Sequence, residues 1–301
     1  MSTAHETSAA ACLRAAERRE FRGEAGPIAA LDWGGEGPIA LLHHANGFCK
    51  GVWGLVAEAL APHYRVVAMD GRGHGDSGPA FSPEGYGWDG YVEDVARVGR
   101  ALLEETGAPR VALGLGHSFG GTSMLGAAAH HRDLFERLLL VDPVIPVRAS
   151  EGPEARTHVE ELVERARRRR ADWPSRSEAR EWFAERDLFA RWDDRALDLY
   201  VLDGLADRPD GTVALKCAGD VEAEVFARGG DVDVAVWARA VSVPTLFLWA
   251  VQGNFSRSRY EELVASMPRA RIEDVDAGHL VPMERPDLVA LAALRSGGEA
   301  L

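Results

Sequence analysis

A serine between two glycines, at the end of an apolar run, constrains the fold of this sequence more than any other feature. Residues 111–121 read Val-Ala-Leu-Gly-Leu-Gly-His-Ser-Phe-Gly-Gly, and an alanine-rich segment of helical character follows at 124–130. This order predicts a strand, a sharp turn with Ser118 at its apex, and a helix, because Gly116 and Gly120 let two backbones approach closely. The same pattern can be a glycine-rich turn with an incidental serine, so its meaning depends on the rest of the chain.

The composition favours an ordinary globular protein. The 301 residues include 46% hydrophobic and 27% charged side chains, with a formal net charge of -13, which is typical of a soluble globular chain. The negative charge argues against nucleic-acid binding, which needs basic patches. Residues 1–11 lack the pattern of a secretory signal, and no apolar run approaches a membrane span. We therefore expect a cytoplasmic protein with no nucleic-acid or membrane partner.

Strand-like and helix-like segments alternate over most of the chain. Strands are expected at 39–44, 64–69, 138–141, 243–249 and 271–276, immediately before Ser118, and as a pair within 20–33. Helices are expected at 53–60, 91–106, 124–130, 256–267 and 286–295. This alternation predicts a parallel sheet covered on both faces. Between about 144 and 241 the alternation stops, and the composition there indicates helices with almost no strand.

Four motifs, in order along the chain, resemble the α/β-hydrolase family. They are the Ser118 turn, His-Ala-Asn-Gly-Phe at 44–48, Asp-Gly-Arg-Gly-His-Gly-Asp-Ser at 70–77, and Ala-Gly-His at 277–279. The resemblance extends from about residue 21 to residue 294.

This resemblance implies an α/β-hydrolase fold with a mostly parallel central sheet and helices on both faces. The segment 144–241 has the position of that family's inserted cap, or lid, which we expect to be all-helical and to cover the emerging serine. The core would comprise 17–143 and 242–301, and residues 1–16 are expected to be flexible.

The resemblance also assigns the catalytic chemistry. A serine hydroxyl is a weak nucleophile, so Ser118 needs a base and a group that orients the base. His279 has the family's late histidine position and is the expected base. Four other histidines, which lie in motif positions that are usually structural, are not expected to act; they are His43, His44, His74 and His117.

The orienting acid departs from the family's common pattern. The family most often places it after the strand that ends near residue 249, but 250–255 contains no carboxylate. Some members place it after the preceding core strand, where this chain has Asp142. Asp142 could instead only cap the turn that it forms with Pro143. A neutral histidine tautomer needs an acceptor, which Asn254 supplies less well than Asp142, so we expect Asp142 to orient the base.

Two backbone amides are expected to form the oxyanion hole. The Phe119 amide follows the nucleophile, and by resemblance the second donor is the amide of Phe48, with Gly47 allowing close approach. Asn46 stands where the family often has histidine. Asn46 and Gly47 are therefore expected to contact the substrate.

The lid carries aromatic and basic residues that allow two interpretations. Its aromatic side chains could line a substrate pocket or form the small core of the lid, and Trp182, Phe183 and Trp192 are the candidates for substrate contact. The basic run 165–170 follows glutamates on the same predicted helix, which favours a solvated face over an anion-binding role.

These observations predict a serine hydrolase that cleaves a small, largely apolar carboxylic ester or lactone through an acyl-enzyme. Hydrolysis of an amide or C–C bond, lyase chemistry and cofactor-free perhydrolysis use the same fold and remain alternatives, as does a non-catalytic small-molecule binder. No cofactor or metal is expected, because Cys12, Cys49 and Cys217 are widely spaced and no histidine or acidic cluster has ligand spacing. The sequence is compatible with a homodimer but does not decide the oligomeric state.

Overall fold

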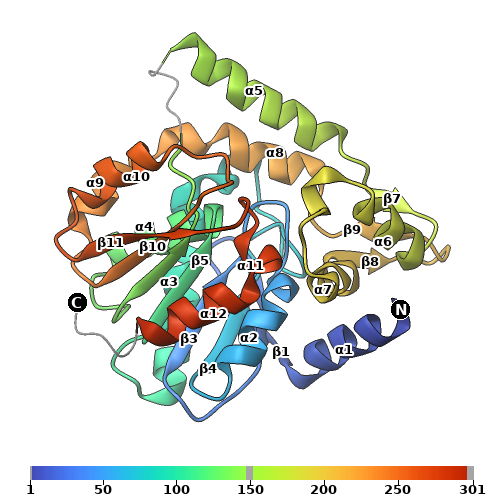
Figure 1. Ribbon diagram of the computed structural model, residues 1–301, viewed down its shortest axis with the longest axis horizontal. Helices are drawn as coiled ribbons and strands as arrows, with labels where there is room; N and C mark the ends of the chain where they lie inside the picture. The colour runs from blue at the N-terminus through green and yellow to red at the C-terminus, as the bar shows by residue number, and fades with distance from the viewer. Residues whose placement is uncertain (1, 147–151, 297–301) are drawn as a thin grey trace.

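The computed structural model describes residues 2–146 and 152–296. Residue 1 of the predicted flexible N-terminus, residues 147–151 of the predicted lid and residues 297–301 of the predicted core lie outside this part. One eight-stranded sheet forms its centre, in the order β1-β2-β4-β3-β5-β6-β10-β11 (Figure 1). The strands are β1 Glu17–Arg22, β2 Pro27–Asp32, β3 Ile39–His43, β4 Arg65–Met69, β5 Leu113–His117, β6 Leu138–Val141, β10 Thr245–Ala250 and β11 Ala270–Val275. β1 and β2 pair antiparallel, β2 joins β4 antiparallel, and all other pairs are parallel. The predicted α/β-hydrolase fold is thus confirmed.

Helices cover both faces of this sheet because its inner strands are apolar on both sides. On β3, Ala40 and Leu42 belong to one core cluster, and Ile39 and Leu41 belong to the other. This division follows from the alternation of side chains along a strand. The first cluster includes residues of α2 (Gly54–Leu60) and α12 (Pro286–Arg295), and the second includes residues of α3 (Trp88–Thr106), α4 (Phe119–His130) and α10 (Arg257–Val264).

The lid contributes no strand to the central sheet within the described residues, as the break in alternation predicted. Its helices are α5 Pro153–Arg168, α6 Arg176–Ala184, α7 Asp194–Gly204, α8 Gly219–Ala227 and α9 Val234–Ala240. In Figure 1, α5 and α8 run across one end of the sheet, and α6 and α7 lie beside it.

The prediction that the lid is all-helical was wrong. Three short antiparallel strands, β7 Asp172–Trp173, β9 Val213–Leu215 and β8 Leu205–Asp207, form a separate sheet. Each strand contributes a buried side chain, namely Trp173, Val213 and Leu205. Strands of two or three residues are too short to show an alternating pattern, which is why the sequence did not reveal them.

The prediction of a flexible N-terminus was also wrong. Residues Ser2–Ala15 form helix α1, which packs on α7 through the buried side chains of Ala9 and Cys12. The Trp33 indole N–H donates to the Cys12 carbonyl at 3.1 Å. Small buried residues in an alanine-rich segment give little apolar periodicity, so the sequence did not indicate this packing.

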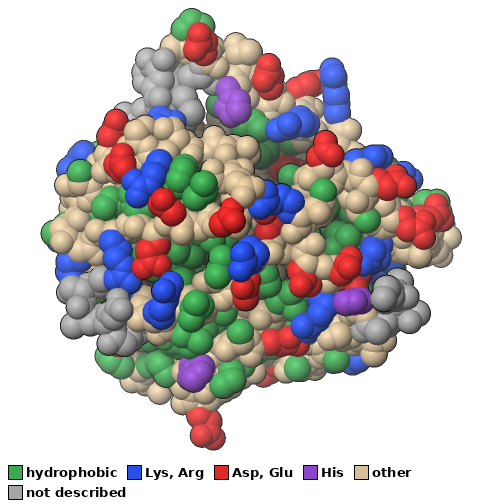
Figure 2. Space-filling view, viewed as in Figure 1, with side chains coloured by type: hydrophobic (Ala, Val, Ile, Leu, Met, Phe, Trp, Pro, Cys, Tyr) green, Lys and Arg blue, Asp and Glu red, His purple; other side chains and the backbone are tan. Residues whose placement is uncertain are grey.

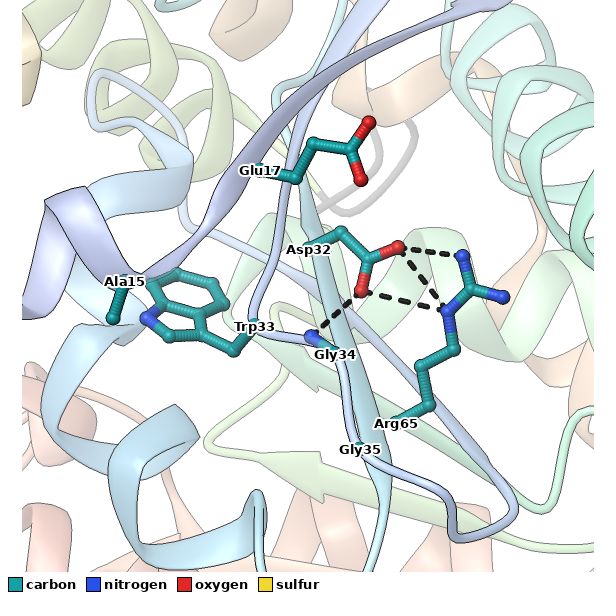
Figure 3. Close-up of a pocket in the computed structure, with 7 residues that line it drawn as sticks. All are labelled: Ala15, Glu17, Asp32, Trp33, Gly34, Gly35 and Arg65. Atoms are coloured by element: carbon teal, nitrogen blue, oxygen red, sulfur yellow. Dashed lines mark hydrogen bonds and ion pairs between the residues drawn. The ribbon is translucent and has the colours of Figure 1, made fainter.

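A pocket lies between α1 and the antiparallel edge of the sheet (Figure 3). Asp32, one of two carboxylates that line it, forms ion pairs with Arg19 and Arg65 at 3.1 and 2.6 Å. None of the predicted site residues lines this pocket.

The surface gives no sign of a single large charged patch on the face that Figure 2 shows, where acidic and basic side chains are interspersed. None of the described helices combines the length and apolar character needed to cross a bilayer.

Candidate active site

The serine turn has the strained geometry that its glycines predicted. Ser118 lies between β5 and α4 with φ 55° and ψ -123°, a backbone conformation that residues other than glycine rarely adopt. A Cβ on Gly116 would lie 2.4 Å from the Gly120 carbonyl oxygen, and a Cβ on Gly120 would lie 2.4 Å from the carbonyl oxygens of His43 and His44. Only glycine fits at either position. The close approach of the two backbones that these glycines allow produces the sharp turn, and Ser118 lies at its apex.

His279 lies within hydrogen-bond distance of both predicted partners. It stands in the loop between β11 and α11 (Val281–Glu284). Its Nε2 is 2.9 Å from Ser118 Oγ, and its Nδ1 is 2.7 Å from Asp142 Oδ2. Phe255 packs edge-on against the imidazole, with ring centroids 5.0 Å apart. In this arrangement Nδ1–H donates to the carboxylate, and Nε2 is free to accept the serine proton.

Asp142 directly follows β6, and its side chain is fully buried. Ala250 N–H donates to Oδ1 at 3.0 Å, so with His279 on Oδ2 both carboxylate oxygens have partners. The Tyr260 hydroxyl lies 3.3 Å from Oδ1, but its single proton has a nearer acceptor in the Pro143 carbonyl at 2.8 Å. Asn254, the alternative, lies exposed in the turn after β10. Because β6 and β10 are parallel neighbours, the last residue of β10, Ala250, supports Asp142 through its backbone amide. No pattern in the sequence indicated that Tyr260 would lie beside this carboxylate.

The two expected oxyanion donors differ in their surroundings. The Phe119 amide begins α4, and no backbone acceptor for it is found in the described part of the chain. The Phe48 amide donates to the Ala45 carbonyl at 3.2 Å. An oxyanion could use Phe48 only by sharing or replacing this long hydrogen bond.

Asn46 and Gly47 contact the lid. Asn46 Nδ2 donates to the Glu222 carbonyl at 3.0 Å, and Asn46 Oδ1 lies 3.0 Å from His74 Nε2. Gly47 has φ 82°, and a Cβ there would lie within 3 Å of the side chains of Glu222 and Arg169. These two side chains form an ion pair with each other. Both therefore pack directly against the backbone of the predicted oxyanion loop.

The lid residues divide between the site and the interior of the lid. Trp192 packs on Phe48 with ring centroids 5.5 Å apart. Trp182 and Phe183 pack instead on Trp173 of the small sheet, and no ring contact places them on Phe48. Of the three aromatic candidates, the structure brings only Trp192 to the predicted oxyanion loop.

The basic run has two kinds of members. Arg168 pairs with Glu164 one turn earlier on α5, as expected for a solvated helix face. Arg169, which follows the helix, is turned inward toward Glu222 and the Tyr200 hydroxyl.

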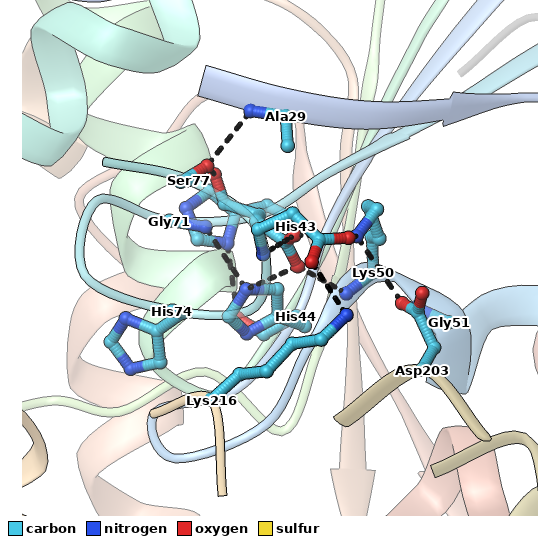
Figure 4. A network of polar contacts seen from close by, with 12 residues as sticks. Ala29, His43, His44, Lys50, Gly51, Gly71, His74, Ser77, Asp203 and Lys216 are labelled. Atoms are coloured by element: carbon cyan, nitrogen blue, oxygen red, sulfur yellow. Dashed lines mark hydrogen bonds and ion pairs between the residues drawn. The ribbon is translucent and has the colours of Figure 1, made fainter. Parts of the chain in front are cut away.

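A buried group of charges supports the segment that follows Phe48 (Figure 4). The Lys50 ammonium is almost completely buried and lies 2.7 Å from Asp70, 2.7 Å from Asp76 and 3.3 Å from Asp203 of α7. Burial alone would lower the pKa of Lys50, but the charges of Asp70 and Asp203 raise it, so the ammonium stays charged. Nothing in the sequence pattern identified Lys50 as part of the site's support.

A comparison with family models matches residues 40–293 to the "Alpha/beta hydrolase family". Because the match spans most of the chain, the protein belongs to the α/β-hydrolase family. One curated relative is a pimeloyl-[acyl-carrier protein] methyl ester esterase of Vibrio cholerae, with 35% identity over 37% of this chain and 40% of that protein. The match thus spans well under half the length of that esterase. An N-formylmaleamate deformylase of Pseudomonas putida is 28% identical over 85% of this chain and 87% of its own.

Solved structures show the same fold. E-2-(acetamidomethylene)succinate hydrolase aligns with a TM-score of 0.79 at 20% identity and covers 93% of this chain and 98% of its own. The enol-lactonase from Burkholderia xenovorans aligns with a TM-score of 0.71 at 20% identity, over 93% and 100%. At these identities the likeness establishes the fold alone. Together with the family match, the names of the curated relatives support a hydrolase.

Three buried histidines around the site are held neutral. Burial lowers the pKa of His43 from 6.5 to about 3, and it lowers the pKa values of His44 and His117 well below 6.5. His117 Nε2–H donates to the His279 carbonyl at 2.8 Å, and its Nδ1 has no partner in the described structure. A single-donor imidazole of this kind is the neutral form.

These depressed pKa values predict that the fold loses stability in mild acid. Below about pH 6.5 the unfolded chain binds protons at these histidines and the folded chain does not, so stability falls as the pH drops toward 4, by up to about 1.4 kcal/mol per pH unit for each histidine. Urea unfolding at pH 7.5, 5.5 and 4.5 measures the slope. His117→Asn should make it shallower; equal slopes for the two proteins would contradict the prediction.

Proposed function

We propose that this protein is a serine hydrolase that cleaves a small carboxylic ester or lactone through an acyl-enzyme. The observation that carries the proposal is the continuous hydrogen-bonded chain from Ser118 Oγ through His279 to the buried Asp142 carboxylate. In the first step Ser118 attacks the carbonyl carbon while His279 accepts its proton, and the tetrahedral oxyanion forms beside the Phe119 amide. His279 then protonates the leaving alcohol. Water, activated by the same histidine, releases the acid and restores Ser118.

Asp142 has a supporting role in both steps. Its carboxylate fixes the tautomer that leaves Nε2 free, and it stabilises the imidazolium that forms when the serine proton is taken up. We assign the acyl group of the substrate to the side of Phe48 and Trp192, because these packed rings offer an apolar surface next to the oxyanion loop.

Amide hydrolysis is the second candidate. One relative that aligns over most of both chains is named as a deformylase of N-formylmaleamate, whereas the match to the methyl ester esterase covers less than half of either chain. The same three residues would serve, with His279 protonating a departing nitrogen instead of an oxygen.

A substrate panel separates these candidates. We expect turnover of p-nitrophenyl esters from acetate to octanoate to exceed that of the matching p-nitroanilides. Ser118→Ala should lower ester turnover by a factor on the order of 10⁴ to 10⁶ while the protein stays folded. Faster turnover of the anilides would favour an amide hydrolase. If Ser118→Ala kept near-wild-type activity, the proposed nucleophile would be wrong. If the protein hydrolysed neither the esters nor the anilides, a non-catalytic binding protein would be favoured.

The orienting acid has a sharper test, because two loops compete for the role. Asp142→Asn should lower ester turnover roughly 10²- to 10⁴-fold at neutral pH, since the amide provides no charge for the imidazolium. Asn254→Ala should change turnover by less than about twofold, because the side chain is exposed and lies in a surface turn. Steady-state kinetics of the two purified variants check both. The reverse order of effects would assign the role to the turn after β10.

A further inference from the structure

The loop that carries His279 is held by a carboxylate outside the proposed catalytic residues. Gly278 N–H donates to Glu284 Oε2 at 2.7 Å, and Leu280 N–H donates to Glu284 Oε1 at 3.3 Å. These are the two amides that flank His279. A Cβ on Gly278 would lie only 2.6 Å from Glu284 Oε1, so glycine is needed there to admit the carboxylate.

Glu284 is almost fully buried, and the residue that balances its charge comes from the lid. Its side chain is 6% exposed, and Arg191 Nε lies 2.8 Å from Glu284 Oε2. A buried carboxylate without a counter-charge is costly, so this pairing favours one placement of the arginine over the histidine loop. Arg191 also donates to Gln252 in the turn after β10.

The neighbours of Arg191 anchor the same stretch of the lid. Trp192 packs on Phe48, and Asp193 N–H donates to the Met283 carbonyl at 2.9 Å. Three consecutive lid residues therefore contact either α11, which directly follows the loop of the proposed base, or the predicted oxyanion loop. A displaced lid would lose the charge partner of Glu284 and the packing on Phe48 together.

We propose that Glu284 is a positioning residue for His279, and that Arg191 makes its placement depend on the seating of the lid. The proposal rests on the proposed function for its effect on turnover, but not for its effect on the loop. With the lid seated, the carboxylate holds the flanking amides and fixes the backbone from which the imidazole reaches Ser118. Small misplacements of catalytic groups have large effects on rate, so this clamp bears on kcat rather than on substrate affinity.

The kinetic test uses Glu284→Gln, which keeps the shape but places an NH₂ group against one of the two amide donors. We expect kcat for p-nitrophenyl acetate to fall about tenfold or more, with KM changed by less than about twofold. Glu273→Gln is the matched control, because this residue also pairs with arginine side chains but does not contact the loop. An unchanged kcat for Glu284→Gln would overturn the proposal.

A double-mutant cycle tests the link to the lid. Arg191→Met should lower kcat in the wild-type background and have little further effect in the Glu284→Gln background, since it acts through that carboxylate. Fully additive effects would show that Arg191 acts independently of Glu284 and would overturn the coupling.

Amide hydrogen exchange tests the clamp without any turnover. Peptides covering residues 276–284 should exchange faster in Glu284→Gln and in Arg191→Met than in wild type and Glu273→Gln. In the first variant one of the amides of 278 and 280 loses its acceptor, and in the second the carboxylate that accepts from both loses the arginine that holds it. Unchanged exchange in both variants would overturn the proposal even in an active enzyme. If exchange increases but wild type hydrolyses no ester, the clamp stands and the proposed ester hydrolysis fails.

Discussion

The buried carboxylate of Asp142 is the constraint on which the geometry of the site depends. A carboxylate with no solvent exposure is costly unless its oxygens are satisfied, and here His279 and the Ala250 amide supply the donors. These donors come from two parts of the chain that are far from Asp142 in sequence. They meet only because β6, β10 and β11 are consecutive parallel strands whose carboxyl ends share one edge of the sheet.

The lid is attached to this edge through charged groups as well as through apolar packing. Asp203 of α7 reaches Lys50, Arg169 and Glu222 rest on Gly47, and Arg191 pairs with Glu284. Each of these contacts falls within or beside a loop that carries a proposed functional group. The position of the lid and the geometry of the site are therefore physically linked, and the further inference is one consequence of this arrangement.

The parts of the molecule that the sequence predicted are those with a local signal. The glycines around Ser118 and the alternation of strands and helices indicate the fold, because both depend on residues close together in the chain. The place of Asp142 at the end of a strand was evident from the local pattern, whereas its role as the orienting acid was expected only from the family resemblance. Lys50, Tyr260 and Glu284 were missed, since their roles depend on partners far away in the sequence. The short lid strands and helix α1 were missed because neither leaves a clear periodic pattern.

Covalent capture by a fluorophosphonate tests the central claim most directly, because the probe reacts only with a serine activated by a working base. The account predicts that intact-mass spectrometry will show one adduct per chain, that peptide mapping will place it on Ser118, and that it will be absent from Ser118→Ala and much slower to form in Asp142→Asn. No adduct on the wild-type protein, or an adduct on another residue, would contradict the account.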